Sequence, residues 1–266
     1  MEIPASRWYN AVSTRRSRRR FNKEPVTPDS MARLSTVCAE FKPFPHARAV
    51  LVTESPEPLY KSIIGPYGKI KGALAFIAFI GDMDGPNVQE QIGYTGEGII
   101  LEAEALHVAT CWVGGFYRKE VVASLINMKQ NEEVLGITPI GYAVKRQATA
   151  ERLMTGFGLT HRRKSLSTIA TGLKESDWPE WIKASLEAAR LAPSAVNRQP
   201  WRFHVEPDNI LITVNKPGME SNISRRLDCG IAMLHIEISA LSHGIHGSWE
   251  FLEDPRVARF RAGNSK

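Results

Sequence analysis

A turn rich in hydroxyl and amide side chains spans residues 192–201, where the sequence reads APSAVNRQPW. Two prolines bound it, and Ser194, Asn197 and Gln199 lie between them. Because side-chain amides both donate and accept hydrogen bonds, this turn suits the mixed edge of a heterocyclic ligand. An ordinary loop that caps the end of a helix is the alternative, and the turn alone does not decide between them.

An arginine cluster lies near the N-terminus, where residues 14–21 read TRRSRRRF. A guanidinium group binds phosphate oxygens in bidentate fashion, and the hydroxyl of Ser17 adds a further contact. The cluster therefore predicts an anion site. A solvated basic surface and a nucleic-acid patch are the alternatives. Neither interleaved aromatic residues nor a helix-turn-helix pattern accompanies the cluster, which argues against nucleic acid.

A glycine pair follows an apolar stretch at residues 110–116, which read TCWVGGF. Glycines leave the backbone bare, so a planar ligand can lie against Gly114 and Gly115 and meet their N–H groups. A simple tight turn is the alternative interpretation of this motif.

Composition limits the class of protein. The chain has 266 residues, of which 43% are hydrophobic, and a net charge of +6, which favours anionic ligands. Its three cysteines show no CxxC spacing, so we expect no metal site, no disulfides and a cytoplasmic location. The longest apolar run, residues 73–80, falls short of the roughly 18 residues of a membrane span. The N-terminus lacks the apolar segment of a secretion signal, so neither export nor membrane insertion is expected.

Hydrophobic periodicity and glycine or proline breaks predict alternating helices and strands. Helices are expected at residues 28–41, 88–109, 119–126, 181–192 and 228–242. Strands are expected at residues 48–53, 72–80, 110–116, 138–144, 202–206, 209–214 and 247–251, the last of these ending the fold. Residues 145–171 are polar and predict a connector.

The two long helices and the strands after them align without gaps at an offset of 137 residues. The offset pairs Trp112 with Trp249 and Gly93 with Gly230. It also pairs Ile99 with Ile236, Ala103 with Ala240 and Val108 with Ile245. We therefore predict an internal duplication, with one half at residues 1–155 and the other at residues 156–266, in one compact α+β unit. Such a fused pair can do alone what a symmetric dimer does.

Taken together, the three motifs resemble those of the FMN-dependent nitroreductases. That family carries RRSxRxF, APSxxNxQPWxF and AxGLGTCWIGGF elements, which read here as RRSRRRF, APSAVNRQPWRF and AEALHVATCWVGGF. Residues 139–142 match the family's PIGY strand, and residues 162–166 resemble its basic RKxL tail. His107 and Ala109 stand where the family has glycines.

The order of the motifs differs from the ordinary family. There the APSxxNxQPW element follows RRSxRxF within one subunit, and each FMN lies across a homodimer interface. Here the element stands in the second half, so the chain resembles the subgroup in which one polypeptide imitates the dimer. That resemblance implies a nitroreductase-like fold of mixed and antiparallel sheets flanked by helices, one complete FMN site, and a monomer, with a dimer still open.

The resemblance also implies a cofactor-binding role for individual residues. Those expected at the FMN phosphate and ribityl chain are Arg15, Arg16 and Ser17, with Arg163 and Lys164 as further phosphate candidates. Arg19 is expected at the pyrimidine end of the ring, and Val113, Gly114 and Gly115 with their N–H groups near N5. Those expected to approach from the other half are Pro193, Ser194, Ala195, Asn197 and Gln199.

The implied reaction is hydride transfer from NADH or NADPH to the flavin, followed by reduction of a nitroaromatic, a quinone or a similar acceptor. Flavin performs the redox chemistry, so no catalytic acid or base is assigned. Three alternatives remain. The first is another flavin reaction on the same fold, such as deiodination of tyrosines or fragmentation of reduced flavin. The second is binding of flavin or of another phosphate ligand without turnover, and the third is nucleic-acid binding.

Overall fold

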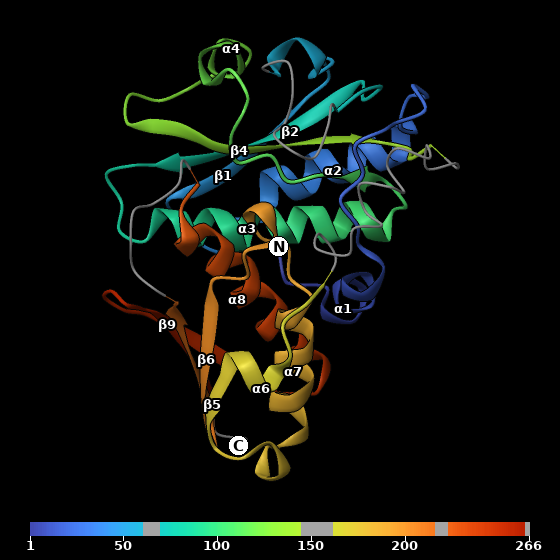
Figure 1. Ribbon diagram of the computed structural model, residues 1–266. Coiled ribbons are helices and arrows are strands. Elements are labelled where there is room, and N and C mark those ends of the chain that lie inside the picture. The colour runs from blue at the N-terminus through green and yellow to red at the C-terminus, as the bar shows by residue number, and fades with distance from the viewer. Residues whose placement is uncertain (61–69, 145–161, 216–222, 264–266) are drawn as a thin grey trace.

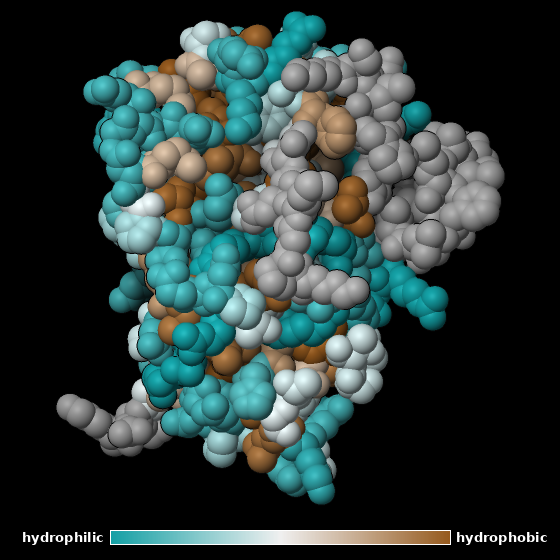
Figure 2. Space-filling view, turned by 60° about the vertical axis from the view of Figure 1, so that its left-hand side comes forward, coloured by the Kyte–Doolittle hydropathy of each residue, from teal (hydrophilic) through white to brown (hydrophobic). Residues whose placement is uncertain are grey.

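The computed structural model describes residues 1–60, 70–144, 162–215 and 223–263. Two sheets lie at opposite ends of the molecule with two long helices between them (Figure 1). The fold is α+β, as predicted. Among the described residues, no helix is long and apolar enough to cross a membrane. On the face shown in Figure 2, some hydrophobic residues are exposed among hydrophilic ones, as on most folded proteins.

The first part of the chain builds a four-stranded antiparallel sheet in the order β1-β2-β4-β3. Its elements are α1 (Ala5–Thr14), α2 (Pro28–Glu40), β1 (Ala47–Val52), η1 (Glu57–Leu59), β2 (Ala75–Asp82), α3 (Val88–Ala105), β3 (Ala109–Thr110), α4 (Lys119–Ser124) and β4 (Glu132–Gly141). Both faces of β2 are buried, which explains its continuous apolar sequence.

The second part builds a five-stranded sheet in the order β5-β6-β7-β9-β8, in which only the β5–β6 pair is parallel. Its elements are α6 (Leu166–Ile169), β5 (Ala170–Gly172), η3 (Glu175–Asp177), α7 (Glu180–Arg190), η4 (Ala195–Asn197), β6 (Trp201–Glu206), β7 (Asn209–Val214), α8 (Arg225–Ser242), β8 (Gly247–Phe251) and β9 (Arg256–Ala262). The order β6-β7-β9-β8 repeats that of the first sheet.

Two expectations about the elements were wrong, and one helix was missed. The predicted connector at residues 145–171 contains α6 and β5 at its end, while residues 145–161 lie outside the described part. Strand β8 does not end the fold, because β9 follows it and pairs with both β7 and β8. Helix α1 was not anticipated; it buries Trp8, Ala11 and Val12.

Helices α3 and α8 pack against each other in the middle of the molecule, and the 137-residue offset carries one range onto the other. A Cβ at Gly93 would lie 2.0 Å from the Leu227 carbonyl oxygen, and one at Gly230 would lie 2.1 Å from that of Glu90. Glu90 and Leu227 are themselves 137 residues apart, so the contact obeys a local two-fold relation. The glycines are therefore needed for close approach of the two helices.

Gly230→Ala should lower the free energy of unfolding by at least about 2 kcal/mol, because the new methyl group would overlap rigid backbone. This loss should exceed the gain in helix propensity of about 1 kcal/mol. Urea denaturation measures the difference. Gly244→Ala is the matched control, since Gly244 has a φ of +74° with nothing within 4 Å, and it should cost only about 1 kcal/mol. Equal losses would argue against tight helix crossing.

Candidate functional site

One cavity of about 280 Å³ is lined by residues from all three sequence motifs. Ser17 and Ser194, which are far apart in the chain, both line it. The candidate residues around it are Arg15, Arg16, Ser17, Arg19, Val113, Gly114, Gly115, Arg163, Pro193, Ser194, Ala195 and Asn197. Lys164 and Gln199 are the two candidates that do not line it.

The arginine cluster reaches the cavity because residues after α1 run in an extended path beside β3. Ser17 forms a parallel bridge with Thr110, and the Arg18 N–H donates to the Thr110 carbonyl at 2.7 Å. In an extended chain, alternate side chains point to opposite sides. Ser17 and Arg19 line the cavity, whereas Arg18 does not. The two-residue spacing from Ser17 to Arg19 therefore follows from strand geometry, whereas Arg15 and Arg16, which also line the cavity, do not follow this alternation.

Three guanidinium groups, those of Arg15, Arg16 and Arg163, line the cavity. Arg15 is only 5% exposed. Burial, followed by the charges of Arg15 and Arg16, lowers the pKa of Arg163 to about 10. The buried Nε atoms of Arg15 and Arg163 have no hydrogen-bond partner within the described ranges. Buried donors and repelling cations are costly without a counter-charge, so this end of the cavity favours an anion.

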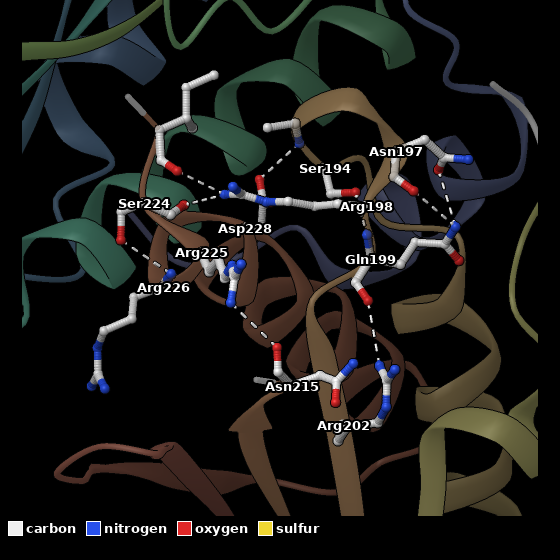
Figure 3. A network of polar contacts seen from close by, with 12 residues as sticks. Ser194, Asn197, Arg198, Gln199, Arg202, Asn215, Ser224, Arg225, Arg226 and Asp228 are labelled. Carbon is white, nitrogen blue, oxygen red and sulfur yellow. Dashed lines mark hydrogen bonds and ion pairs between the residues drawn. The ribbon is translucent and has the colours of Figure 1, made fainter. Parts of the chain in front are cut away.

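The turn at residues 194–199 holds three non-glycine residues in the left-handed region: Val196, Asn197 and Gln199 have φ values of +48°, +54° and +47°. Such backbone persists only where surrounding contacts determine it. Here the Gln199 N–H donates to Ser194 Oγ at 2.9 Å (Figure 3). The turn is therefore a rigid wall of the cavity.

Asp228 and Arg198 clamp this turn to the start of α8 (Figure 3). Asp228 Oδ1 accepts from the Ala195 N–H at 3.0 Å, and its Oδ2 accepts from Arg198 Nε at 2.6 Å. The Arg198 guanidinium also donates to the carbonyls of Ile223 and Ser224. Burial raises the pKa of Asp228 from 3.8 to about 6, against the lowering effect of Arg198.

The raised pKa of Asp228 predicts a pH-dependent stability. Between about pH 4 and pH 6 the folded chain keeps a proton on Asp228 that the unfolded chain has lost. This group should therefore lower the free energy of unfolding as the pH rises through that window, by up to about 3 kcal/mol. Urea denaturation of the native chain and of Asp228→Asn at several pH values isolates this contribution as their difference. A difference that does not vary between pH 4 and pH 7 would contradict the prediction.

Arg163 connects the turn to the C-terminal end of α7. Its Nη1 donates to Asn197 Oδ1 at 2.5 Å, and its Nη2 donates to the Leu191 carbonyl at 3.1 Å. Asn197 and Arg163 therefore line the cavity as a hydrogen-bonded pair, in which the Asn197 side chain orients the Arg163 guanidinium group.

Lys164 and Gln199 have a different place from the one expected. Lys164 Nζ donates to the carbonyls of Arg198 and Gln199, and its backbone N–H donates to Gln199 Oε1. Gln199 Nε2 donates to the Arg162 carbonyl at 3.0 Å. Both side chains hold the turn from outside the cavity, because the turn needs partners for its own carbonyl groups.

Val113, Gly114 and Gly115 form a wall of the cavity, the glycine wall, which differs from the sequence expectation in one detail. The Val113 N–H donates to the Ile137 carbonyl at 2.9 Å, so it is already used inside the sheet and is not free for a ligand. A Cβ at Gly114 would lie 3.1 Å from the Ile223 side chain, and one at Gly115 would lie 3.7 Å from it. His107 has a φ of +60°, and thus takes a glycine-like conformation where the sequence motif has glycine.

Sequence reasoning missed the apolar lining of the cavity and its mouth. Leu227 and Ile231 lie one turn apart on α8, a helical spacing that could have indicated a shared face. Four further cavity residues belong to the sequence motifs but were assigned no role of their own: Cys111, Trp112, Phe116 and Val196. The remaining cavity residues, which lie outside the motifs, are Val12, Leu191, Ile223 and Asp228. The cavity therefore combines a cationic end with apolar walls and bare backbone, which suits a flat ligand with a phosphorylated tail.

Comparison with known proteins places this geometry in a family context. Residues 7–240 match the family model described as "Putative TM nitroreductase". The crystal structure of a "putative nitroreductase" from Thermotoga maritima shares 18% identity and covers 96% of this chain and 93% of that one, with a TM-score of 0.66. At 18% identity, this similarity shows a shared fold.

Shorter structures align over part of the chain only. A nitroreductase family protein from Clostridium difficile shares 19% identity, covering 61% of this chain and 96% of that one, with a TM-score of 0.44. A nitroreductase with bound FMN from Bacteroides fragilis shares 14% identity, covering 53% of this chain and 90% of that one, with a TM-score of 0.43. No match was found among curated proteins.

Proposed function

The chain belongs to the family described as "Putative TM nitroreductase", and from this premise we propose that it is an FMN-dependent oxidoreductase. It would transfer hydride from NADH or NADPH to a nitroaromatic, a quinone or a similar small acceptor. The observation that carries the proposal is the meeting of an arginine cluster, a glycine wall and an amide-rich turn around one cavity.

The residues around the cavity fit FMN at both ends. Arg15, Arg16, Ser17 and Arg163 would hold the phosphate and the ribityl chain, since three guanidinium groups and one hydroxyl group line the cavity. Gly114 and Gly115 leave bare backbone along one wall, and Leu227 and Ile231 supply apolar contact. FMN, when bound, supplies the redox chemistry, while the protein orients it and tunes its electronics.

The other candidate residues would have individual roles in binding FMN. Arg19 would lie at the pyrimidine end, where a cation stabilises negative charge. Pro193, Ser194, Ala195 and Asn197 would bind from the second half. Lys164 and Gln199 would act indirectly, by holding the turn at residues 194–199. Val113 would contribute only its position beside the glycines, because its N–H already donates to the Ile137 carbonyl.

Two halves, residues 1–155 and 156–266, would together imitate a dimer within one monomeric cytoplasmic chain. The 137-residue offset would then place a second, equivalent site at a cluster of aromatic rings. Tyr94 corresponds there to Ile231, and Phe251 to Gly114. The Phe44 ring lies 5.0 Å from that of Tyr94 and 5.4 Å from that of Phe251, measured between centroids. At this second place, bulky aromatic rings would stand where the cavity has glycine and isoleucine. They would leave no space for a second flavin, so we expect one flavin per chain.

Flavin content and turnover test the proposal together. Purified protein should be yellow, should release one FMN per chain, and should oxidise NADH or NADPH when a nitroaromatic or a quinone is added. Absorbance at flavin wavelengths gives the stoichiometry, and loss of nicotinamide absorbance gives the rate. Two FMN per chain would contradict the single site. A yellow protein inert to both donors would favour flavin binding without turnover, and a protein unable to bind FMN would reject the proposal.

Nucleic-acid binding through the arginine cluster is the weaker alternative. Arg15 is buried, and Arg15, Arg16 and Arg19 line the cavity with Arg163 from the second half. Binding to nucleic acid would fall steeply with salt and would be indifferent to Asn197.

A further inference from the structure

A buried polar group lies directly behind the arginine end of the cavity, where the two long helices meet. Glu97 on α3 and His235 on α8 are both completely buried, and His235 Nε2 lies 3.0 Å from Glu97 Oε1. Trp112 Nε1 donates to Glu97 Oε2 at 2.7 Å. Arg15 Nε lies 3.6 Å from Glu97 Oε1.

These distances show that Glu97 attracts Arg15 without binding it by a hydrogen bond to Nε. His235 and Trp112 engage both carboxyl oxygens at hydrogen-bond distance, whereas 3.6 Å is too long for an N–H···O bond. Arg15 Nε has no hydrogen-bond partner among the residues described. The guanidinium is therefore held beside a carboxyl group whose oxygens are engaged elsewhere.

Hydrogen-bond chemistry fixes the charge that His235 and Glu97 carry together. His235 Nδ1 lies 2.8 Å from the Ala188 carbonyl oxygen, which can only accept, so Nδ1 carries a hydrogen. The contact between Nε2 and Glu97 Oε1 then requires a second proton between them. This proton makes either imidazolium with carboxylate or neutral imidazole with carboxylic acid. The pair has a net charge of zero in both cases.

We propose that His235 is a positioning residue for anion binding: it neutralises Glu97, so that the charge of Arg15 remains directed at the phosphate of FMN. This inference rests on the proposed function. An uncompensated carboxylate at this buried place would cancel the charge of Arg15, leaving Arg16 and Arg163 to face the phosphate. With the neutral pair, all three guanidinium charges act on the anion.

A simple salt bridge between Arg15 and Glu97 would predict the opposite response to mutation. In that case Glu97→Gln would release the charge of Arg15 and strengthen phosphate binding, and His235→Gln would have little effect. A neutral pair predicts that Glu97→Gln changes little, because His235 then becomes neutral too. The side-chain amide introduced by Glu97→Gln can still accept from Trp112 and donate to His235 Nε2.

Riboflavin and FMN are the probes, because they differ only in the phosphate. Their dissociation constants are measured by flavin fluorescence for the full-length native chain, His235→Gln, Glu97→Gln and the double variant. The ratio of the riboflavin to the FMN constant should fall about tenfold in His235→Gln. It should stay within about twofold of the native ratio in Glu97→Gln, and should return there in the double variant. Loss of packing would lower both affinities alike and would not be rescued by a second substitution.

Ser185→Ala is the matched control, since it removes another buried hydrogen bond between α7 and α8, that of Ser185 Oγ to the Ile236 carbonyl. Its ratio should equal the native one. Should His235→Gln fail to fold, His235→Asn takes its place. The ratio measured for the double variant is then compared with the ratio measured for Glu97→Gln alone. An unchanged ratio in the His235 variants, a raised ratio in Glu97→Gln, or no rescue in the double variant would overturn the inference. A native chain that binds neither flavin would instead reject the proposed function.

Discussion

Arg163→Ala is expected to weaken FMN binding by about two orders of magnitude. The substitution removes a half-buried guanidinium that lines the cavity, together with the group that fixes Asn197 Oδ1. A charge-assisted hydrogen bond contributes about 1.5–3 kcal/mol, and one such bond from Arg163 to the phosphate accounts for a loss of this size. The dissociation constant for FMN, measured by fluorescence titration of the stripped protein, checks this result.

Arg162→Ala is a closely matched control, because it removes the same charge from the adjacent position. The Arg162 side chain is exposed, and only its carbonyl group contacts Asn197 and Gln199. This variant should keep nearly native affinity. Arg163→Lys, which keeps the charge but loses the guanidinium fork, should fall between the two. Equal weakening by Arg162→Ala and Arg163→Ala would place the phosphate elsewhere.

The candidate site could be predicted to the extent that its chemistry is concentrated in short segments. Ser17 and Arg19 share a side because they are two residues apart in an extended segment. Ser194 and Asn197 share a tight turn. For such residues local geometry decides the orientation of the side chain, and a motif contains that geometry. The α+β class followed for the same reason, since most helices and strands showed their own periodicity.

Features that depend on distant partners could not be predicted. Nothing near Val113 indicates that its N–H pairs with Ile137, and nothing near Lys164 indicates that its ammonium group holds the carbonyls of the turn. Glu97 and His235 are 138 residues apart, so only the crossing of α3 and α8 brings them together. Strand β9 reads RVARFRA, which breaks strict alternation at Val257 and Ala258, and its place between β7 and β8 depends on pairing with both of these strands.

Separating the two halves should abolish flavin binding. A fragment of residues 1–155 would contain Arg15 and Gly114, and a fragment of residues 156–266 would contain Arg163 and Asn197, so neither would hold the whole cavity. Each would also expose one of the central helices, which are buried along nearly their whole length. Large exposed apolar surfaces aggregate or seek a partner. Expressed alone, each fragment should be insoluble or colourless.

Co-expressed fragments, cut between residues 155 and 156, should reassemble and retain one FMN per pair, because α3 of the first fragment packs against α8 of the second. Co-purification of an untagged fragment with a tagged partner, and the flavin absorbance of the pair, measure reassembly. Gly230→Ala in the second fragment should prevent it, since the methyl group would meet the Glu90 carbonyl across the helix crossing, whereas Gly244→Ala should not. A second fragment that folds alone and binds FMN would show that the flavin site does not need the first half, and the arginines of the N-terminal cluster would then require another role.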